Sequence, residues 1–264
     1  MTFVQILGTD VHYIERGDGP PMLFLHGSGS CAEAWHQQFD AFSDHYRVIA
    51  YDSVNHGHSS NSPLDGAEPD RADELEGFLR ALGLERPVIA GNSMGAMTML
   101  RWAVRNPDRA RALIPSGMGV TPADAPNQPM RPQAEPSDED ALFLPAEGGF
   151  TREFPTTHPV PYARYIRLRS TATRIEATRR PRRATAVNPA RGELADLVGS
   201  IRSPMQIIVG EHDWLAEAGV RLHQRVEGSR FATVPGAPHN VYYETPTAYN
   251  DVVATFLAEI HATV

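Results

Sequence analysis

The sequence lacks several features that define particular classes of protein. Its 264 residues contain a single cysteine, Cys31, so no disulfide can form within the chain and a disulfide-stapled secreted scaffold is not expected. There is no lysine, so all 24 basic residues are arginines, and the 32 acidic residues leave a net charge of −8. Non-specific binding to nucleic acid needs a surplus of cations for the phosphates, so we expect no nucleic-acid partner.

Long hydrophobic runs are also missing. No stretch approaches the roughly 18 apolar residues of a membrane span, so we expect no membrane partner. The N-terminus has no basic start, no long apolar run and no small-residue cleavage site, so a secretory signal is not expected and the cytoplasm is the predicted location. A hydrophobic share of 41% with 21% charged residues is typical of a globular protein.

What the sequence does contain is an alternation of short apolar strands with longer helical patterns. Strands are predicted at residues 4–7, 11–14, 22–25, 46–51, 87–90, 112–114, 205–209 and 231–234. Helices are predicted at residues 69–82, 93–106, 215–226 and 247–261. This order predicts an α/β fold, with a mostly parallel sheet covered by helices on both faces.

The alternation breaks between residues 116 and 200. The first half of this segment is rich in Pro, Asp and Glu, and the second half is rich in Arg. We interpret residues 116–200 as an inserted, mainly helical cap, or lid, over one edge of the sheet. Residues 1–115 and 201–264 would then form the core domain.

The strongest functional signal is Gly91-Asn92-Ser93-Met94-Gly95, which lies between a predicted strand and a predicted helix. In this context G-x-S-x-G is typical of a nucleophile elbow, in which a strained turn projects the serine hydroxyl and small neighbours make room for the turn. The backbone N–H of Met94 would begin the helix, where it can donate to an oxyanion. The alternative is a chance match in a glycine-rich loop.

A second motif, His26-Gly27-Ser28-Gly29, follows the strand predicted at residues 22–25. A loop in this place can supply a second oxyanion donor, for which the backbone N–H of Ser28 is the candidate. The motif is weak alone, but together with the downstream elbow it predicts an oxyanion hole formed by Ser28 and Met94.

Two later loops supply the remaining catalytic candidates. Residues 210–214 read Gly-Glu-His-Asp-Trp after the strand at 205–209, and they place a carboxylate, Asp213, that could orient a histidine through its Nδ1 proton. Residues 235–240 follow the strand at 231–234 and offer His239 as the base. The chain order Ser, Asp, His is that expected of a nucleophile elbow of this kind.

Both assignments have competitors. Glu211, Asp196 and Asp124 are alternative carboxylates, and Asp213 is favoured over Glu211 because it lies two residues further into its loop. The chain has 11 histidines, most of which are expected on the surface or in the core. His239 differs from them because it lies on the loop after the last strand.

These motifs, in this order and over nearly the whole chain, resemble the α/β-hydrolase superfamily. Residues 52–59 are also similar to its D-x-R-G-x-G-x-S loop, with Asn55 where Arg is usual. Within the superfamily the chain resembles the meta-cleavage-product hydrolases, which cut a carbon–carbon bond in vinylogous diketone acids. The elbow matches theirs, including Asn92, and Trp35 follows His26-Gly27 at their spacing.

The resemblance extends into the cap, where residues 143–151 and then Arg164-Tyr165 look like a segment whose arginine clamps the substrate carboxylate. The departures are Ser30-Cys31 in place of Pro-Gly, Gln37 in place of a substrate-contacting Asn, and Asn240 to Tyr242 where a Trp is common. The residues predicted to bind substrate are Gly27, Asn92, Trp35, Gln37, Arg164 and Trp214.

The charge of the cap segment is strongly positive. Residues 152–191 contain ten arginines and two acidic residues, in a chain whose net charge is −8. This pattern fits a basic cap that attracts an anionic substrate, and it fits somewhat better a solvated helix that pairs with acidic surface elsewhere. Arg164 is the first choice for an inward-pointing arginine, and Arg167 and Arg169 are weaker choices.

The sequence therefore predicts a serine hydrolase acting on a small carbonyl compound: an ester, a lactone or a vinylogous diketone acid. No cofactor and no metal site are predicted, and Cys31 is expected to pack rather than react. The expected partner is a small-molecule substrate, with an anionic one and a homodimer as open options. The alternative is a non-hydrolytic member of the same fold, either a cofactor-free lyase or oxygenase or a ligand-binding protein.

Overall fold

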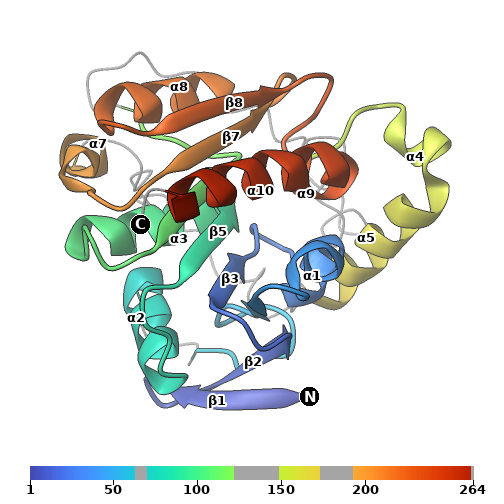
Figure 1. Ribbon diagram of the computed structural model, residues 1–264. Helices are drawn as coiled ribbons and strands as arrows, with labels where there is room; N and C mark the ends of the chain where they lie inside the picture. Colours follow the sequence, from blue (N-terminus) through green and yellow to red (C-terminus); the bar gives the residue numbers. More distant parts are fainter. Residues whose placement is uncertain (63–69, 122–148, 173–192, 263–264) are drawn as a thin grey trace.

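The computed structural model describes residues 1–62, 70–121, 149–172 and 193–262. Their centre is one sheet with the strand order β1-β2-β4-β3-β5-β6-β7-β8 (Figure 1). The strands are β1 (Thr2–Ile6), β2 (Thr9–Arg16), β3 (Pro21–Leu25), β4 (Arg47–Tyr51), β5 (Val88–Asn92), β6 (Ala112–Ser116), β7 (Gln206–Gly210) and β8 (Arg230–Val234). Strand β2 pairs antiparallel with β1 and β4, and all other neighbours are parallel.

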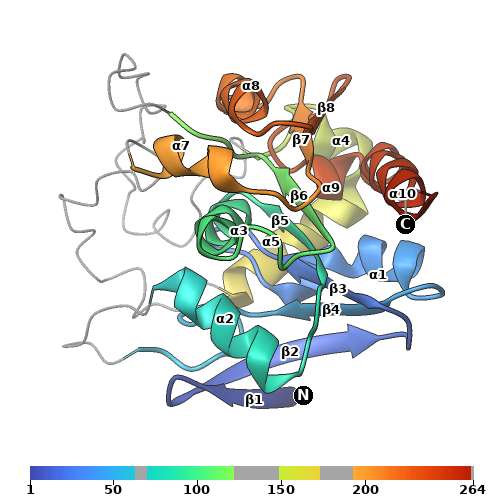
Figure 2. The same ribbon diagram turned by 60° about the vertical axis from the view of Figure 1, so that its left-hand side comes forward.

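Helices cover both faces of the sheet (Figure 2). One face carries α2 (Arg71–Ala81), α3 (Met94–Arg105), α7 (Glu193–Leu197) and α8 (Ala216–Arg225), and the other carries α1 (His36–Phe42) and α10 (Pro246–Ala262). Strand β3 shows how the sequence divides the core, because successive side chains of a strand point to opposite faces. Leu23 and Leu25 pack with the first set of helices, and Met22 and Phe24 pack with the second.

The remaining elements are short or belong to the cap segment. They are the 3₁₀ turns η1 (Ala32–Trp35) and η4 (Val198–Ser200), and the helices α4 (Phe154–Thr157), α5 (Pro159–Ala172) and α9 (Val241–Glu244). Figure 1 shows α4 and α5 on the side of the sheet that carries α1, and α5 contacts η1. Within the described ranges, no helix has both the length and the apolar character needed to cross a membrane.

The fold class predicted from the sequence is confirmed, and all eight predicted strands are present with their ends shifted by a few residues at most. Helix α7 and η4 lie within the segment assigned to the cap, yet Leu194 and Val198 are buried in the main core. The packing of the core therefore begins before residue 201. Asp124, residues 143–148 and the arginines at 174, 179, 180, 182, 183 and 191 lie outside the described residues, so the full cap, 116–200, stays a prediction.

The parallel strands bring the sequence motifs to one edge of the sheet. The chain leaves β3 into His26, leaves β5 into Ser93 and leaves β6 into Gly117. Strands β7 and β8 run parallel to these, and Asp213 and His239 follow them. Because the carboxyl ends of parallel strands meet at the same edge, residues far apart in the sequence converge there.

Candidate active site

Ser93 occupies a strained turn between β5 and α3. Its backbone has φ +52° and ψ −113°, a conformation that a residue with a side chain adopts at a cost and that is concentrated at functional sites. The flanking glycines have no room for a side chain: a Cβ on Gly91 would lie 2.7 Å from the carbonyl carbon of Gly95, and one on Gly95 would lie 2.2 Å from Leu25 O. The G-x-S-x-G spacing is thus a steric requirement of this turn.

Backbone hydrogen bonds hold the elbow, and the first N–H groups of α3 remain available to a ligand. The Ser93 N–H donates to Ser116 O at 2.9 Å, and Ser93 O accepts from the Met97 N–H at 3.0 Å. The first N–H groups of a helix have no carbonyl partner within it, so those of Met94 and its neighbours point out of the N-terminus of α3. The helix dipole adds positive potential at this point, which suits a developing oxyanion.

Asp213 and His239 are joined by a buried hydrogen bond. His239 Nδ1 lies 2.9 Å from Asp213 Oδ1, and the two residues are 6% and 5% exposed. Asp213 Oδ1 also accepts the Leu215 N–H at 2.9 Å, which fixes the carboxylate in its loop. A carboxylate at Nδ1 holds the proton there, so Nε2 is left as the acceptor.

The competing carboxylates lie elsewhere. Glu211 is exposed and accepts the Gly236 N–H at 2.7 Å, so it supports the turn after β8 and does not reach the imidazole. Asp196 is exposed on α7. Of the described carboxylates, Asp213 is therefore the one that contacts His239.

The His239 ring is held from two sides. Trp214 stacks on it, with ring centroids 4.0 Å apart and planes inclined by 27°, while remaining 48% exposed. On another side the ring borders Gly117, where a Cβ would lie 2.9 Å from His239 Cε1 and 2.8 Å from Asn92 Oδ1. The imidazole thus lies beside the residue that precedes Ser93. Among the described residues its ring nitrogens hydrogen-bond only to Asp213, and such contacts with a nucleophile often tighten when substrate binds.

The loop after β3 lies against the elbow. A Cβ on Gly27 would be 3.6 Å from Ser93 Cβ, and the neighbouring Ser28 is exposed. His26 shapes this loop, because its Nδ1 is 2.8 Å from Gly27 O and its Nε2 accepts the Ser53 N–H at 3.0 Å. Burial lowers the pKa of His26, so the ring is neutral and Nδ1–H is the donor to Gly27 O. A neutral, buried His26 therefore fixes the backbone around Ser28.

The residues predicted to contact substrate take different places. Trp214 is exposed beside His239, and Gly27 faces Ser93. Asn92 is 1% exposed and accepts from Ser116 Oγ at 3.1 Å, so its side chain lies beneath the elbow. Trp35 is fully buried and stacks on Tyr242 with ring centroids 3.9 Å apart, which is the position of a core residue. The partly buried Gln37 donates to Tyr243 O at 3.0 Å.

Two of the cap arginines, Arg164 and Arg169, differ in what they face. The positive charge of Arg164 adds to burial in lowering the pKa of His36, which places Arg164 near the junction of η1 and α1. Arg169 instead lies over the oxyanion loop, because a Cβ on Gly29 would be 3.2 Å from its Nη2. Among the described residues, the carboxylates that form ion pairs do so with histidines or with arginines other than Arg169. The structure thus puts Arg169, one of the two weaker choices from the sequence, next to the motif residues.

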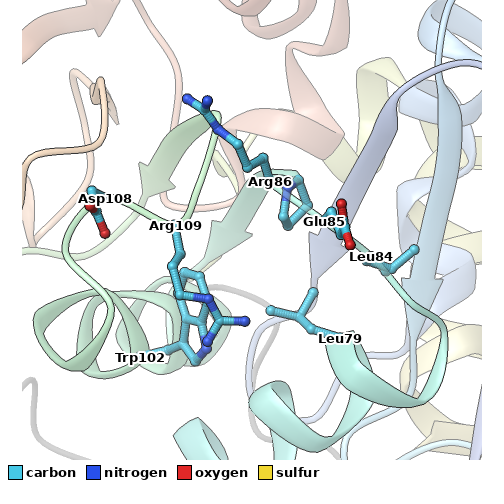
Figure 3. Close-up of a pocket in the computed structure, with 8 residues that line it drawn as sticks. Leu79, Leu84, Glu85, Arg86, Trp102, Asp108 and Arg109 are labelled. Carbon is cyan, nitrogen blue, oxygen red and sulfur yellow. The ribbon is translucent and has the colours of Figure 1, made fainter.

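A surface cavity of about 550 Å³ lies at the other end of the sheet (Figure 3). Its lining includes Leu84 and Pro87, just before β5, and Trp102 near the end of α3. Strand β5 separates it from Ser93, and five residues of strand span about 16 Å. Arg109 lies over the Trp102 ring there and its guanidinium is paired with Glu76. This cavity is therefore separate from the candidate active site.

Comparison with known proteins agrees with this fold. The alpha/beta hydrolase fold family matches residues 20–246. The chain belongs to this family. One relative, the 2-(acetamidomethylene)succinate hydrolase of Mesorhizobium japonicum, is 28% identical over 92% of this chain and 90% of its own. The (E)-2-((N-methylformamido)methylene)succinate hydrolase of Acinetobacter baylyi is 36% identical over 39% of each chain. Several relatives are thus matched over only about two fifths of their own length.

A solved structure with the same fold is a meta-cleavage product hydrolase from Pseudomonas fluorescens, with a TM-score of 0.81 and 21% identity over 98% of both chains. The predicted superfamily is confirmed, and the likeness to this meta-cleavage product hydrolase is one of fold. The homodimer and the cytoplasmic location stay predictions.

Sequence reasoning missed two residues of this alpha/beta hydrolase that lie within the site. Gly117 touches the His239 ring, and the signal that could have found it is its position directly after β6 at the functional edge. In the sequence, Asn240 marks only a departure from the meta-cleavage-product hydrolases. It is 7% exposed and contacts both the elbow and the cap segment, which no local pattern indicates.

Proposed function

We propose that this alpha/beta hydrolase is a serine hydrolase with Ser93 as nucleophile, His239 as base and Asp213 as the group that orients the base. The observation that carries the proposal is the buried 2.9 Å contact between His239 Nδ1 and Asp213 Oδ1, at the strand edge where Ser93 has its strained φ. Held in this tautomer, His239 offers Nε2 to the Ser93 proton.

The reaction would proceed by acyl transfer. Ser93 Oγ attacks the substrate carbonyl as His239 takes its proton, and the backbone N–H groups of Met94 and Ser28 receive the oxyanion. His239⁺ then gives the proton to the leaving group, leaving an acyl group on Ser93. Water, deprotonated by His239, releases the acid and restores the hydroxyl.

We further propose that the substrate carries a carboxylate. Arg169 supports this, because its guanidinium lies over Gly29 in the oxyanion loop and it is absent from the ion pairs that the described carboxylates form. Two relatives are named for succinate derivatives, which are anions. An arginine beside the oxyanion loop would orient an anionic substrate by a charge-assisted hydrogen bond.

The first experiment tests the nucleophile. A fluorophosphonate probe should label the wild-type protein at Ser93, located by peptide mass spectrometry. Ser93→Ala should remain unlabelled and lose more than about 1,000-fold in kcat on p-nitrophenyl butyrate. Ser43→Ala, distant from the site, should behave like wild type. A folded wild-type protein that is neither labelled nor active on esters contradicts the proposal and favours a non-hydrolytic role.

The second experiment tests the substrate class with two esters of equal acyl length. Mono-p-nitrophenyl succinate carries a carboxylate, and p-nitrophenyl butyrate does not. Arg169→Ala should raise KM for the anionic ester about 10-fold or more, as for a lost hydrogen bond to a charged group, and change the neutral ester little. Arg152→Ala, an exposed cap arginine, is the matched control.

The same assay decides between the two arginines. If Arg164→Ala gives the selective loss and Arg169→Ala does not, the choice made from the sequence is right and the structural argument for Arg169 fails. A dienoate diketone acid, followed by loss of its visible absorbance, distinguishes carbon–carbon cleavage from ester or lactone hydrolysis.

A further inference from the structure

Asn240, the residue after His239, joins three separate segments of the chain. Its Oδ1 accepts from Asn92 Nδ2 at 3.3 Å, and its Nδ2 donates to the Tyr165 hydroxyl at 3.4 Å. Its backbone N–H donates to Gly149 O at 2.9 Å. Asn92 precedes Ser93, and Tyr165 and Gly149 belong to the cap segment. One buried amide thus connects the elbow, the loop that carries His239 and the cap.

The contacts around Asn240 leave it little freedom. A Cβ on Gly149 would lie 2.3 Å from Asn240 Nδ2, so the backbone of the cap segment lies directly against the amide. The Tyr165 ring is 3% exposed and packs at 4.7 Å from both Phe150 and Tyr243. Because its ring is packed in this way, Tyr165 holds its hydroxyl in one place. The Asn240 amide, which donates to that hydroxyl, is held in position as a result.

The Asn92 side of this hydrogen-bonded series is equally fixed. Asn92 Oδ1 accepts from Ser116 Oγ, so its amide orientation is set and Nδ2 is the group that faces Asn240. The amide of Asn240 must then present Oδ1 to Asn92 and Nδ2 to Tyr165. Through these two contacts the position of Tyr165 on helix α5 is linked to that of Asn92 in the elbow.

We propose that Asn240 is a positioning residue through which Tyr165 of the cap sets the place of His239 relative to Ser93. The inference rests on the proposed function, because it assigns Tyr165 and Asn240 a role in aligning that base and that nucleophile. Seating of α5 brings the Tyr165 hydroxyl to Asn240 and fixes the backbone at residue 239. When this link is lost, the fold and the substrate contacts remain, and the base is less well aligned.

The test is a double-mutant cycle on Tyr165→Phe and Asn240→Ala. Each single variant should lower kcat for p-nitrophenyl butyrate by about 5-fold or more, with KM within about 2-fold of wild type, because alignment and not binding is affected. The double variant should match Asn240→Ala within about 2-fold, because Tyr165 acts through Asn240. Tyr162→Phe removes a hydroxyl from the same helix and should leave both constants unchanged.

A second variant guards against misfolding. Gly149→Ala leaves Asn240 and Tyr165 in the chain but displaces the amide, and it should reproduce the loss in kcat while circular dichroism keeps its native form. Effects of Tyr165→Phe and Asn240→Ala that multiply in the double variant overturn the inference, as does a fall in Tm with kcat per folded molecule unchanged.

Fluorophosphonate labelling separates this inference from the proposed function. If wild type is labelled at Ser93 but the variants are labelled and turn over at its rate, only the inference fails. If wild type is not labelled, the proposed function fails and the inference falls with it. The link is supported if Asn240→Ala is labelled at about one fifth of the wild-type rate or less and Asn240→Gln is labelled at a rate between those two.

Discussion

Gly117→Ala perturbs the placement of His239 without altering any proposed catalytic group. The glycine is buried after β6 with φ +58°, and a Cβ there would lie 2.9 Å from His239 Cε1. Carbon atoms in contact normally lie about 3.5–4.0 Å apart, so the ring or the glycine backbone must move by at least ~0.6 Å. A misplacement of about 1 Å near the reacting atoms can cost 10²-fold, so we expect kcat to fall about 10- to 100-fold.

The substitution also strains the backbone, and a matched variant separates the two effects. Gly83 has φ +61°, and a Cβ there would meet nothing within 4 Å. Alanine at such a φ costs about 1 kcal/mol in either place, which lowers Tm by about 2–4 °C in a protein of this size. Gly83→Ala should therefore lower Tm and leave kcat for p-nitrophenyl butyrate unchanged.

Three measurements decide the outcome: kcat and KM, the rate of fluorophosphonate labelling, and Tm by differential scanning fluorimetry. We expect Gly117→Ala to lose kcat and labelling rate at a Tm close to that of Gly83→Ala. If Gly117→Ala keeps the kcat of Gly83→Ala, His239 does not need the place it occupies in this structure, and the reasoning is refuted.

Three further predictions follow from other contacts. Asp213→Asn should lower kcat by about 10⁴-fold with circular dichroism unchanged, because an amide no longer enforces the tautomer, whereas Glu211→Gln should keep kcat within 2-fold. Burial lowers the pKa of His56 to about 3, so its contribution to stability is complete above pH 6.5 and is lost as pH falls toward 3. As pH falls from 6.5 toward 3, the free energy of unfolding, measured in urea, should decrease more steeply in wild type than in His56→Asn, by about 1.4 kcal/mol per pH unit. Equal slopes in the two proteins would contradict the burial argument. Burial raises the pKa of the Cys31 thiol to about 12, so Ellman's reagent at pH 8 should label it only after unfolding, and rapid labelling of the native protein would be inconsistent with this.

Elements with strong local signals were predictable because their boundaries depend on nearby residues. Strand β5 and helix α3 begin and end within two residues of their predicted positions, since the elbow glycines and Pro107 mark the turns. Helices α1 and α9 were not predicted. Gln38 in α1 donates to Tyr242 O in α9 at 3.0 Å, across most of the chain, so these short helices depend on tertiary contacts that no local pattern contains.

The candidate site likewise contains residues that local motifs predict and residues whose role depends on the tertiary structure. The motifs that carry Ser93, Asp213 and His239 are local sequences at strand ends, and each could be recognised alone. The choice between Arg164 and Arg169 depends on how helix α5 is placed over Gly29, because the two arginines are only about 7–8 Å apart along that helix. The role of Asn240 could not be predicted from a local pattern either, since its three partners come from distant segments.

The glycine contacts suggest how mutations in the site will behave. A Cβ on Gly95 would lie 2.2 Å from Leu25 O, so the elbow is held against β3 and the oxyanion loop. A Cβ on Gly210 would lie 2.2 Å from Pro238 O, so the loop of the acid is held against the loop of the base. Within each pair the backbones touch, and a side chain there must force them apart.

Between these two pairs, contact is made by side chains. Asn92 meets Asn240 at 3.3 Å, and the His239 ring borders Gly117. Side-chain contacts can loosen while the backbone stays in place, so the junction between nucleophile and base is the more adjustable part of the site. Alanine at Gly95 or Gly210 should therefore reduce folding yield and activity together, whereas changes at Asn240 or Gly117 should reduce activity in a protein that still folds.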